Sequence, residues 1–151
     1  MDKTALALVI VGAVNWGLIS LFKFDLVAWI FGGQDAVLSR IIYAESGAEP
    51  MDGQIAVGNV VLNRVASSEF PNSVAGVIFD RVNGTQFEPV ENGTVYRTPS
   101  PQSAEAAVRV LNGDNTIGSA LYFYAPALSQ GVWIQNNRTF LKTIGCHRFY
   151  L

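Results

Sequence analysis

The sequence of 151 residues has few of the side chains that build disulfides and metal sites. Cys146 is its only cysteine and His147 its only histidine. No disulfide can therefore form within the chain, and His and Cys side chains cannot assemble a zinc site. A nucleophile activated by histidine would have to use His147, which leaves carboxylates as the other source of acid–base chemistry. We expect no metal or other cofactor.

Positive charge is also scarce. Ten Lys and Arg residues stand against twelve Asp and Glu residues, and no cluster of basic residues could neutralise a row of phosphates. Nucleic acid is therefore not an expected partner. The sequence contains no internal repeat and no low-complexity tract, and its length leaves room for one modest domain.

One long hydrophobic run lies near the N-terminus. Residues 4–22 (TALALVIVGAVNWGLISLF) would form a helix roughly 28 Å long, close to the hydrocarbon thickness of a bilayer, so a single membrane span is predicted. No small-residue cleavage site follows the run, which favours an uncleaved anchor over a removable signal peptide. The flanking charges, Lys3 and Lys23, do not fix the orientation of the span.

Two short motifs in this region, residues 15–18 (NWGL) and 24–27 (FDLV), are informative. Through residue 43 the segment resembles a family of small two-span bacterial membrane proteins of unknown function. Those proteins would continue into a second span, whereas the apolar piece 26–31 is too short to cross a bilayer and is interpreted as interfacial or as a broken half-span. The junction resembles a splice between two families. We therefore predict an anchor segment at 1–34 and a separate domain at 35–151.

From Asp35 onward the pattern is that of an α+β domain. Apolar residues recur at three- and four-residue steps, with Asp35 and Ser100 placed as helix caps and a loop-rich region between residues 80 and 99. The predicted helices cover residues 35–47, 50–67, 73–79 and 100–111, and the predicted strands cover residues 121–124 and 139–144.

Eight short motifs follow one another in this domain. They are residues 42–45 (IYAE), 49–50 (EP), 53–57 (GQIAV), 60–65 (VVLNRV), 70–74 (FPNSV), 84–90 (GTQFEPV), 120–124 (ALYFY) and 144–150 (IGCHRFY). Over residues 38–150 the sequence resembles the cell-wall hydrolase family of the spore-cortex-lytic (SleB/CwlJ) type. The resemblance implies a lysozyme-like fold of mixed α and β structure, similar to that of lytic transglycosylases.

The resemblance also implies that Glu45, the glutamate of the YAE motif, is the catalytic acid. Cleaving a glycosidic bond requires protonation of a poor leaving group, and a carboxylic acid can do this when a partly apolar site raises its pKa. Glu45 follows Ile41 and Ile42 at the margin of an apolar helix. Glu49 could add like-charge repulsion. Without the resemblance, both would also fit ordinary solvated carboxylates at a helix end.

The matched motifs place no second carboxylate as a nucleophile or base. This favours a lytic transglycosylase, which cleaves between N-acetylmuramic acid and N-acetylglucosamine and forms a 1,6-anhydro-muramic end. Two alternatives stay open: a hydrolytic muramidase with Glu88 or Glu91 as base, and a catalytically silent wall-binding module. The expected partner is the peptidoglycan glycan strand, of vegetative wall or spore cortex. The catalytic domain is expected outside the cytoplasm, in the cell envelope or spore, tethered to the bacterial membrane.

Five further residues are candidates for substrate binding: Glu49, Gln86, Tyr122, Tyr124 and His147. Sugar sites combine flat apolar faces with amide or hydroxyl groups, and the two tyrosines would face one side of a strand. Core packing is the competing interpretation for the tyrosines, and a structural hydrogen bond is the competing interpretation for His147.

Two departures from the family pattern lie near the expected cleft. Residues 46–48 (SGA) replace the usual Ala-Arg-Gly between the two glutamates, and Ala125 stands where an asparagine is typical. The first change removes an arginine that could have positioned the acid. Both changes leave room for weakened activity or altered specificity.

Overall fold

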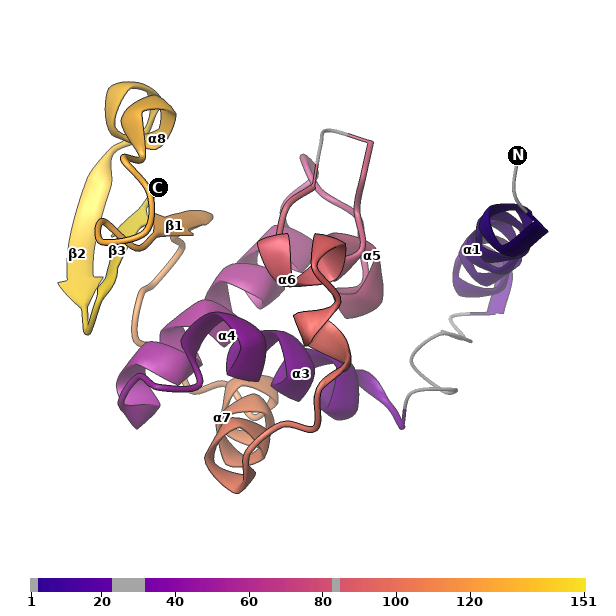
Figure 1. Ribbon diagram of the computed structural model, residues 1–151, viewed down its shortest axis with the longest axis horizontal. Coiled ribbons are helices and arrows are strands. Elements are labelled where there is room, and N and C mark those ends of the chain that lie inside the picture. Colours follow the sequence, from indigo (N-terminus) through magenta and orange to yellow (C-terminus); the bar gives the residue numbers. More distant parts are fainter. Residues whose placement is uncertain (1–2, 23–31, 83–84) are drawn as a thin grey trace.

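The computed structural model describes residues 3–22, 32–82 and 85–151. Figure 1 shows a group of helices with a small sheet at one end and helix α1 on the other side of the molecule. The helices are α1 (Lys3–Phe22), α3 (Gln34–Ser46), α4 (Met51–Ala66), α5 (Val74–Ile78), α6 (Glu88–Glu91), the 3-10 turn η1 (Thr94–Tyr96), α7 (Pro101–Leu111) and α8 (Val132–Asn137). The strands are β1 (Tyr122–Tyr124), β2 (Phe140–Ile144) and β3 (His147–Tyr150).

The predicted α+β class is confirmed in a mostly helical form. Ser100 caps α7 as predicted, because its side chain accepts a hydrogen bond from the backbone N–H of Ser103. The predicted cap at Asp35 is wrong: α3 begins one residue earlier, with Gly33 at the N-cap and no side-chain cap. Asp35 instead lies in the first turn, where its charge suits the positive end of the helix.

Helices α3, α4 and α7 pack around the larger of two apolar clusters. Ile41 and Ile42 of α3, Ile55 of α4 and Val110 of α7 are buried there. The helices approach closely at Gly58, where a Cβ atom would lie only 2.9 Å from Ile42 Cδ1 and from Val110 Cγ2. The C-terminal end of α3, which carries Glu45, is thereby fixed against the rest of the domain.

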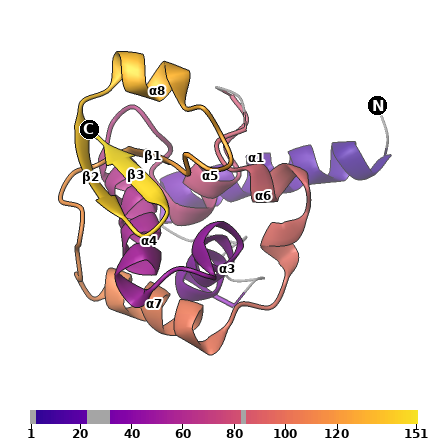
Figure 2. The same cartoon turned by 60° about the vertical axis from the view of Figure 1, so that its left-hand side comes forward.

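The sheet is antiparallel, with the strand order β1-β3-β2. Strand β3 is central, and its Phe149 faces Phe123 of β1 in the register. Phe149 packs on Val57 and Val60 of α4 in the second apolar cluster, and Phe123 packs against both clusters. In Figure 2 the sheet lies beside α4, in agreement with the packing of Phe149 on that helix.

The predicted N-terminal helix is confirmed as α1. Within residues 3–22, 32–82 and 85–151, however, no helix is both long and apolar enough to cross a membrane, so the span predicted at residues 4–22 is not confirmed. The interfacial piece predicted at residues 26–31 lies outside the described residues.

Candidate active site

A large cavity, here called the main cleft, lies between the helices and the sheet. Its volume is about 1100 Å³. One wall comes from the end of α3, from α4 and from the segment around α6, and the other comes from β1, the loop after it and the β2–β3 turn. The residues that line it include Glu45, Glu49, Arg64, Gln86, Glu88, Phe123, Tyr124, Cys146 and His147.

Glu45 lies in the last turn of α3 and lines the main cleft. Its pKa is raised from 4.5 to about 7, chiefly because burial penalises the charged carboxylate and next because the Glu88 carboxylate repels it. The Arg64 cation acts in the opposite direction. From the sequence, Glu49 was considered as a source of like-charge repulsion; in the structure the repelling carboxylate is that of Glu88. Glu45 can therefore carry a proton near neutral pH and still release it.

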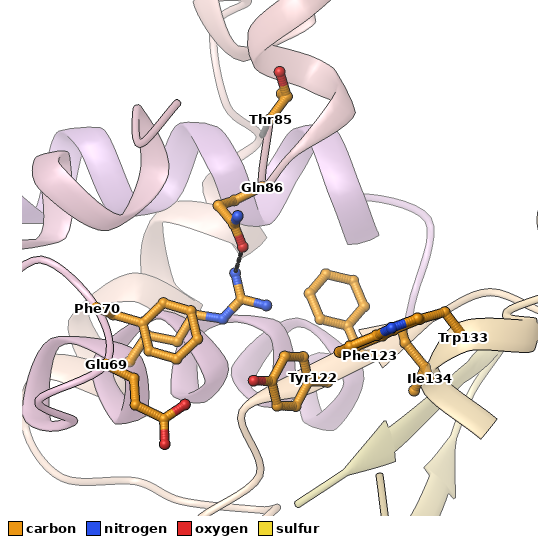
Figure 3. Close-up of a pocket in the computed structure, with 9 residues that line it drawn as sticks. Glu69, Phe70, Thr85, Gln86, Tyr122, Phe123, Trp133 and Ile134 are labelled. Atoms are coloured by element: carbon orange, nitrogen blue, oxygen red, sulfur yellow. Dashed lines mark hydrogen bonds between the residues drawn. The ribbon is translucent and has the colours of Figure 1, made fainter. Parts of the chain in front are cut away.

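Arg64 was not predicted as a site residue, yet it lies at the centre of the site. It is only 5% exposed, and its Nε donates to the carbonyl oxygen of Leu121 at 2.8 Å. Its Nη1 donates to Oε1 of Gln86 at 3.3 Å (Figure 3). Burial lowers the pKa of Arg64 to about 10, so the side chain stays cationic at neutral pH. The available sequence signal was an arginine one helical turn after Val60 and Val61 in a predicted helix.

Glu49 lines the main cleft, but its carboxylate is engaged by the β2–β3 turn. The backbone N–H of Cys146 donates to Oε1 at 3.2 Å and to Oε2 at 3.1 Å. Gly145, at a φ of 55°, leaves the space that the carboxylate occupies, because a Cβ atom there would overlap Oε2 of Glu49. Glu49 thus ties the start of α4 to the turn that forms the far wall of the cleft.

His147 is buried beside this carboxylate. Its Nδ1 lies 3.8 Å from Oε1 of Glu49 and has no hydrogen-bond partner among the described residues. The ring packs on Phe123 with 5.4 Å between centroids. Burial lowers the pKa of His147, against the opposite effect of Glu49. His147 therefore supports Phe123, which lines the cleft and which the sequence did not single out.

Tyr122 and Tyr124 lie two residues apart on β1 and line different cavities. Tyr124 is largely buried, packs on Tyr150 at 5.9 Å between ring centroids, and lines the main cleft. Tyr122 lines a second cavity of about 430 Å³. Arg64, Gln86 and Phe123 line both cavities, so the two lie side by side.

The two carboxylates considered as a hydrolytic base are placed differently. Glu88 lines the main cleft and acts electrostatically on Glu45. Glu91, one helical turn later, accepts a short hydrogen bond from the Thr85 hydroxyl and is not among the residues that line the cleft. The departures from the family pattern, residues 46–48 and Ala125, do line the main cleft, as expected from the sequence.

Two families match the chain. Residues 48–150 match the family described as Cell Wall Hydrolase, and residues 1–47 match a domain of unknown function. Glu45 lies three residues before the first of these matches. The N-terminal segment is 60% identical over 47 residues to the uncharacterized membrane protein YuzA of Bacillus subtilis. This match covers 31% of this chain and 60% of that protein.

Curated relatives extend this similarity. The chain is 40% identical over 113 residues to a spore cortex-lytic enzyme of Bacillus cereus, covering 75% of this chain and 42% of the relative. It is 39% identical to the spore cortex-lytic enzyme of Bacillus subtilis, covering 75% of this chain and 36% of the relative. The chain therefore spans less than half the length of these relatives.

Solved structures match the fold. The catalytic domain of the germination-specific lytic transglycosylase SleB from Bacillus anthracis superposes with a TM-score of 0.71 at 38% identity, covering 78% of this chain and 93% of that one. The catalytic domain of the Bacillus cereus SleB protein gives a TM-score of 0.69 at 38% identity, and the match covers 78% of this chain and 89% of that one.

Proposed function

Because this chain belongs to the cell wall hydrolase family, we propose that it cleaves peptidoglycan glycan strands as a lytic transglycosylase with Glu45 as its single acid and base. The observation that carries the proposal is a carboxyl group whose pKa is raised to about 7 at the wall of a cleft of about 1100 Å³. The proposal includes a lysozyme-like architecture, in which an acid at a helix end faces a cleft between helices and a small sheet.

The proposed reaction has two proton transfers. Protonated Glu45 first gives its proton to the glycosidic oxygen between N-acetylmuramic acid and N-acetylglucosamine, and the bond from that oxygen to the anomeric carbon breaks. The Glu45 carboxylate then accepts the proton of the muramic 6-hydroxyl. The oxygen of that hydroxyl bonds to the same anomeric carbon, which closes the 1,6-anhydro ring. No water is consumed, and Glu45 ends protonated as it began.

The surroundings of Glu45 suit both halves of this cycle. Burial and the Glu88 charge favour the protonated acid that starts the reaction. The Arg64 cation stabilises the carboxylate formed after the first transfer, because it acts on Glu45 in the opposite sense. A pKa near the working pH serves a group that must both give and accept a proton.

A hydrolytic muramidase is the second candidate, and Glu88 is the observation that favours it. Its carboxylate shares the main cleft with Glu45 and could activate a water molecule on the far side of the sugar ring. Glu91 is the weaker choice of base, since its carboxylate is hydrogen-bonded to Thr85 outside the lining of the cleft.

Mass spectrometry of digested wall separates these two reactions. We expect purified peptidoglycan treated with the full-length chain to yield muropeptides with 1,6-anhydro-muramic ends, each one water lighter than the hydrolysis product. Digestion of the same wall by a hydrolytic lysozyme is the control. Products with reducing muramic ends alone would contradict the transglycosylase and favour the route through Glu88.

The place of action forms part of the same proposal. Peptidoglycan lies outside the cytoplasmic membrane, and residues 1–47 resemble a protein named as a membrane protein, so we infer that residues 1–34 hold the enzyme at the membrane with its cleft facing the wall. We expect the full-length chain to sediment with bacterial membranes and a variant lacking residues 1–31 to stay in the supernatant. Equal partition of both would contradict the tether.

A further inference from the structure

The second cavity lies beside the main cleft and takes no part in the chemistry at Glu45. Its volume of about 430 Å³ falls within the range of small-molecule sites. The shared residues Arg64, Gln86 and Phe123 place it directly beside the main cleft. A chain molecule in the main cleft could therefore continue into it.

Four aromatic side chains contribute to its wall. Figure 3 shows Phe70 and Glu69 on one side, and Tyr122, Phe123 and Trp133 on the other. The Tyr122 ring meets Phe70 edge to face at 6.3 Å and meets Trp133 edge to face at 6.2 Å, as centroid distances. The Arg64 guanidinium lies over the Phe70 ring and the Arg138 guanidinium lies over the Tyr122 ring, so Trp133 offers the more open flat face to the apolar C–H face of a pyranose ring.

Trp133 is the most exposed of these rings. It is 57% exposed, although a side chain of this size is normally mostly buried. It is held in place by its neighbours, because the Arg138 guanidinium lies 5.2 Å from its ring centroid and also donates from Nη2 to the Tyr122 hydroxyl at 2.7 Å. A fixed and exposed aromatic face is a stacking surface with little ordering cost.

The polar groups favour a neutral ligand. Gln86 and Thr85 supply an amide and a hydroxyl at the wall. The Arg64 side chain is almost fully buried and donates to the Leu121 carbonyl and to Gln86, so its cation lies within the wall of the cavity. Glu69 adds an exposed carboxylate that would repel an anionic muramic group.

We propose that the second cavity is a saccharide subsite that stacks a neutral N-acetylglucosamine unit of the glycan strand against Trp133, outside the bond cleaved at Glu45. The subsite rests on the proposed function for its role in catalysis. It makes the enzyme bind several sugar units at once, so that long strands are preferred over short fragments.

Chitotriose, the trimer of N-acetylglucosamine, is the probe for this subsite. We expect calorimetric titration of the full-length chain to show binding that Trp133→Ala weakens about tenfold, the loss of one aromatic stacking contact. Val132→Ala is the matched control, because Val132 is equally exposed on α8 but does not line the cavity. Circular dichroism checks that both variants are folded.

Activity on purified glycan strands adds a second readout. We expect Trp133→Ala to lower kcat/KM about tenfold, mainly through KM, with the pH profile of cleavage unchanged. Chitotriose binding that is absent, or that Trp133→Ala weakens no more than Val132→Ala, would overturn the subsite. Trp133-dependent binding by a chain that cleaves no wall would support the subsite and contradict the proposed function instead.

Discussion

Replacing Glu45 with glutamine is expected to reduce cleavage of purified wall about 10³-fold or more. Glutamine keeps the size of the side chain, but its amide is too weak an acid to protonate the glycosidic oxygen, and general acid catalysis of this kind contributes about 10²- to 10⁴-fold. In the proposed reaction the same group also acts as base, so both transfers are lost. Release of soluble muropeptides measures the rate. Glu105→Gln, an exposed glutamate on α7, is the matched control.

Stability distinguishes loss of chemistry from loss of fold. The pKa of Glu45 is raised from 4.5 to about 7 in the folded state, so its protonated form is favoured and folding is weakened as pH rises through this window. Above pH 7 the glutamine variant should therefore be more stable than wild type, by at most about 3 kcal/mol. Below pH 4.5 this difference should vanish. A variant that is inactive and also less stable at pH 8 would not support the catalytic role.

Two other outcomes are informative. Unchanged lysis by Glu45→Gln would remove the mechanism. A wild-type chain that binds wall without releasing muropeptides would indicate a catalytically silent wall-binding module, the alternative raised by residues 46–48 and Ala125 in the cleft lining.

Local patterns predicted the helical part of the fold well. The apolar spacing that predicted helices over 35–47 and 50–67 corresponds to α3 and α4, whose buried faces meet in one cluster. The sheet was predicted in part, because β1 and β2 were expected and β3 was not. Strand β3 has only four residues and is defined by its pairing with β1 on one side and β2 on the other. The alternation of apolar and polar residues within so short a segment does not predict such long-range pairing.

The site was less predictable than the fold. The YAE motif identified Glu45 through the family resemblance, but the partners that tune it are distant in sequence. Glu88, considered from the sequence as a base, also raises the pKa of Glu45, an effect that proximity along the chain had suggested for Glu49. Arg64 and Phe123 reach the cleft only because α4 packs beside β1. Electrostatic coupling depends on the distance between two charges in the folded chain, and the hydrophobic periodicity of the sequence does not predict that distance.

Cleavage is expected to decrease about tenfold per pH unit above pH 7, because only protonated Glu45 can begin the reaction and its pKa is about 7. The measurement is kcat/KM on purified glycan strands between pH 5 and pH 9, which reports on the free enzyme. A descending limb near pH 4.5, the ordinary value for a glutamate, would show that burial does not hold the proton on Glu45.

Glu88→Gln tests the origin of this pH dependence. Removing the like charge should lower the pKa of Glu45, so the descending limb moves to lower pH while cleavage at pH 5 is retained. Glu91→Gln is the matched control, because Glu91 belongs to the same short helix but does not line the cleft. The descending limb of the pH profile of this variant should stay at the wild-type pH. If Glu88→Gln instead abolishes cleavage at every pH, Glu88 is the base of a hydrolytic enzyme. The same substitution therefore separates a carboxylate that tunes the acid from one that activates water.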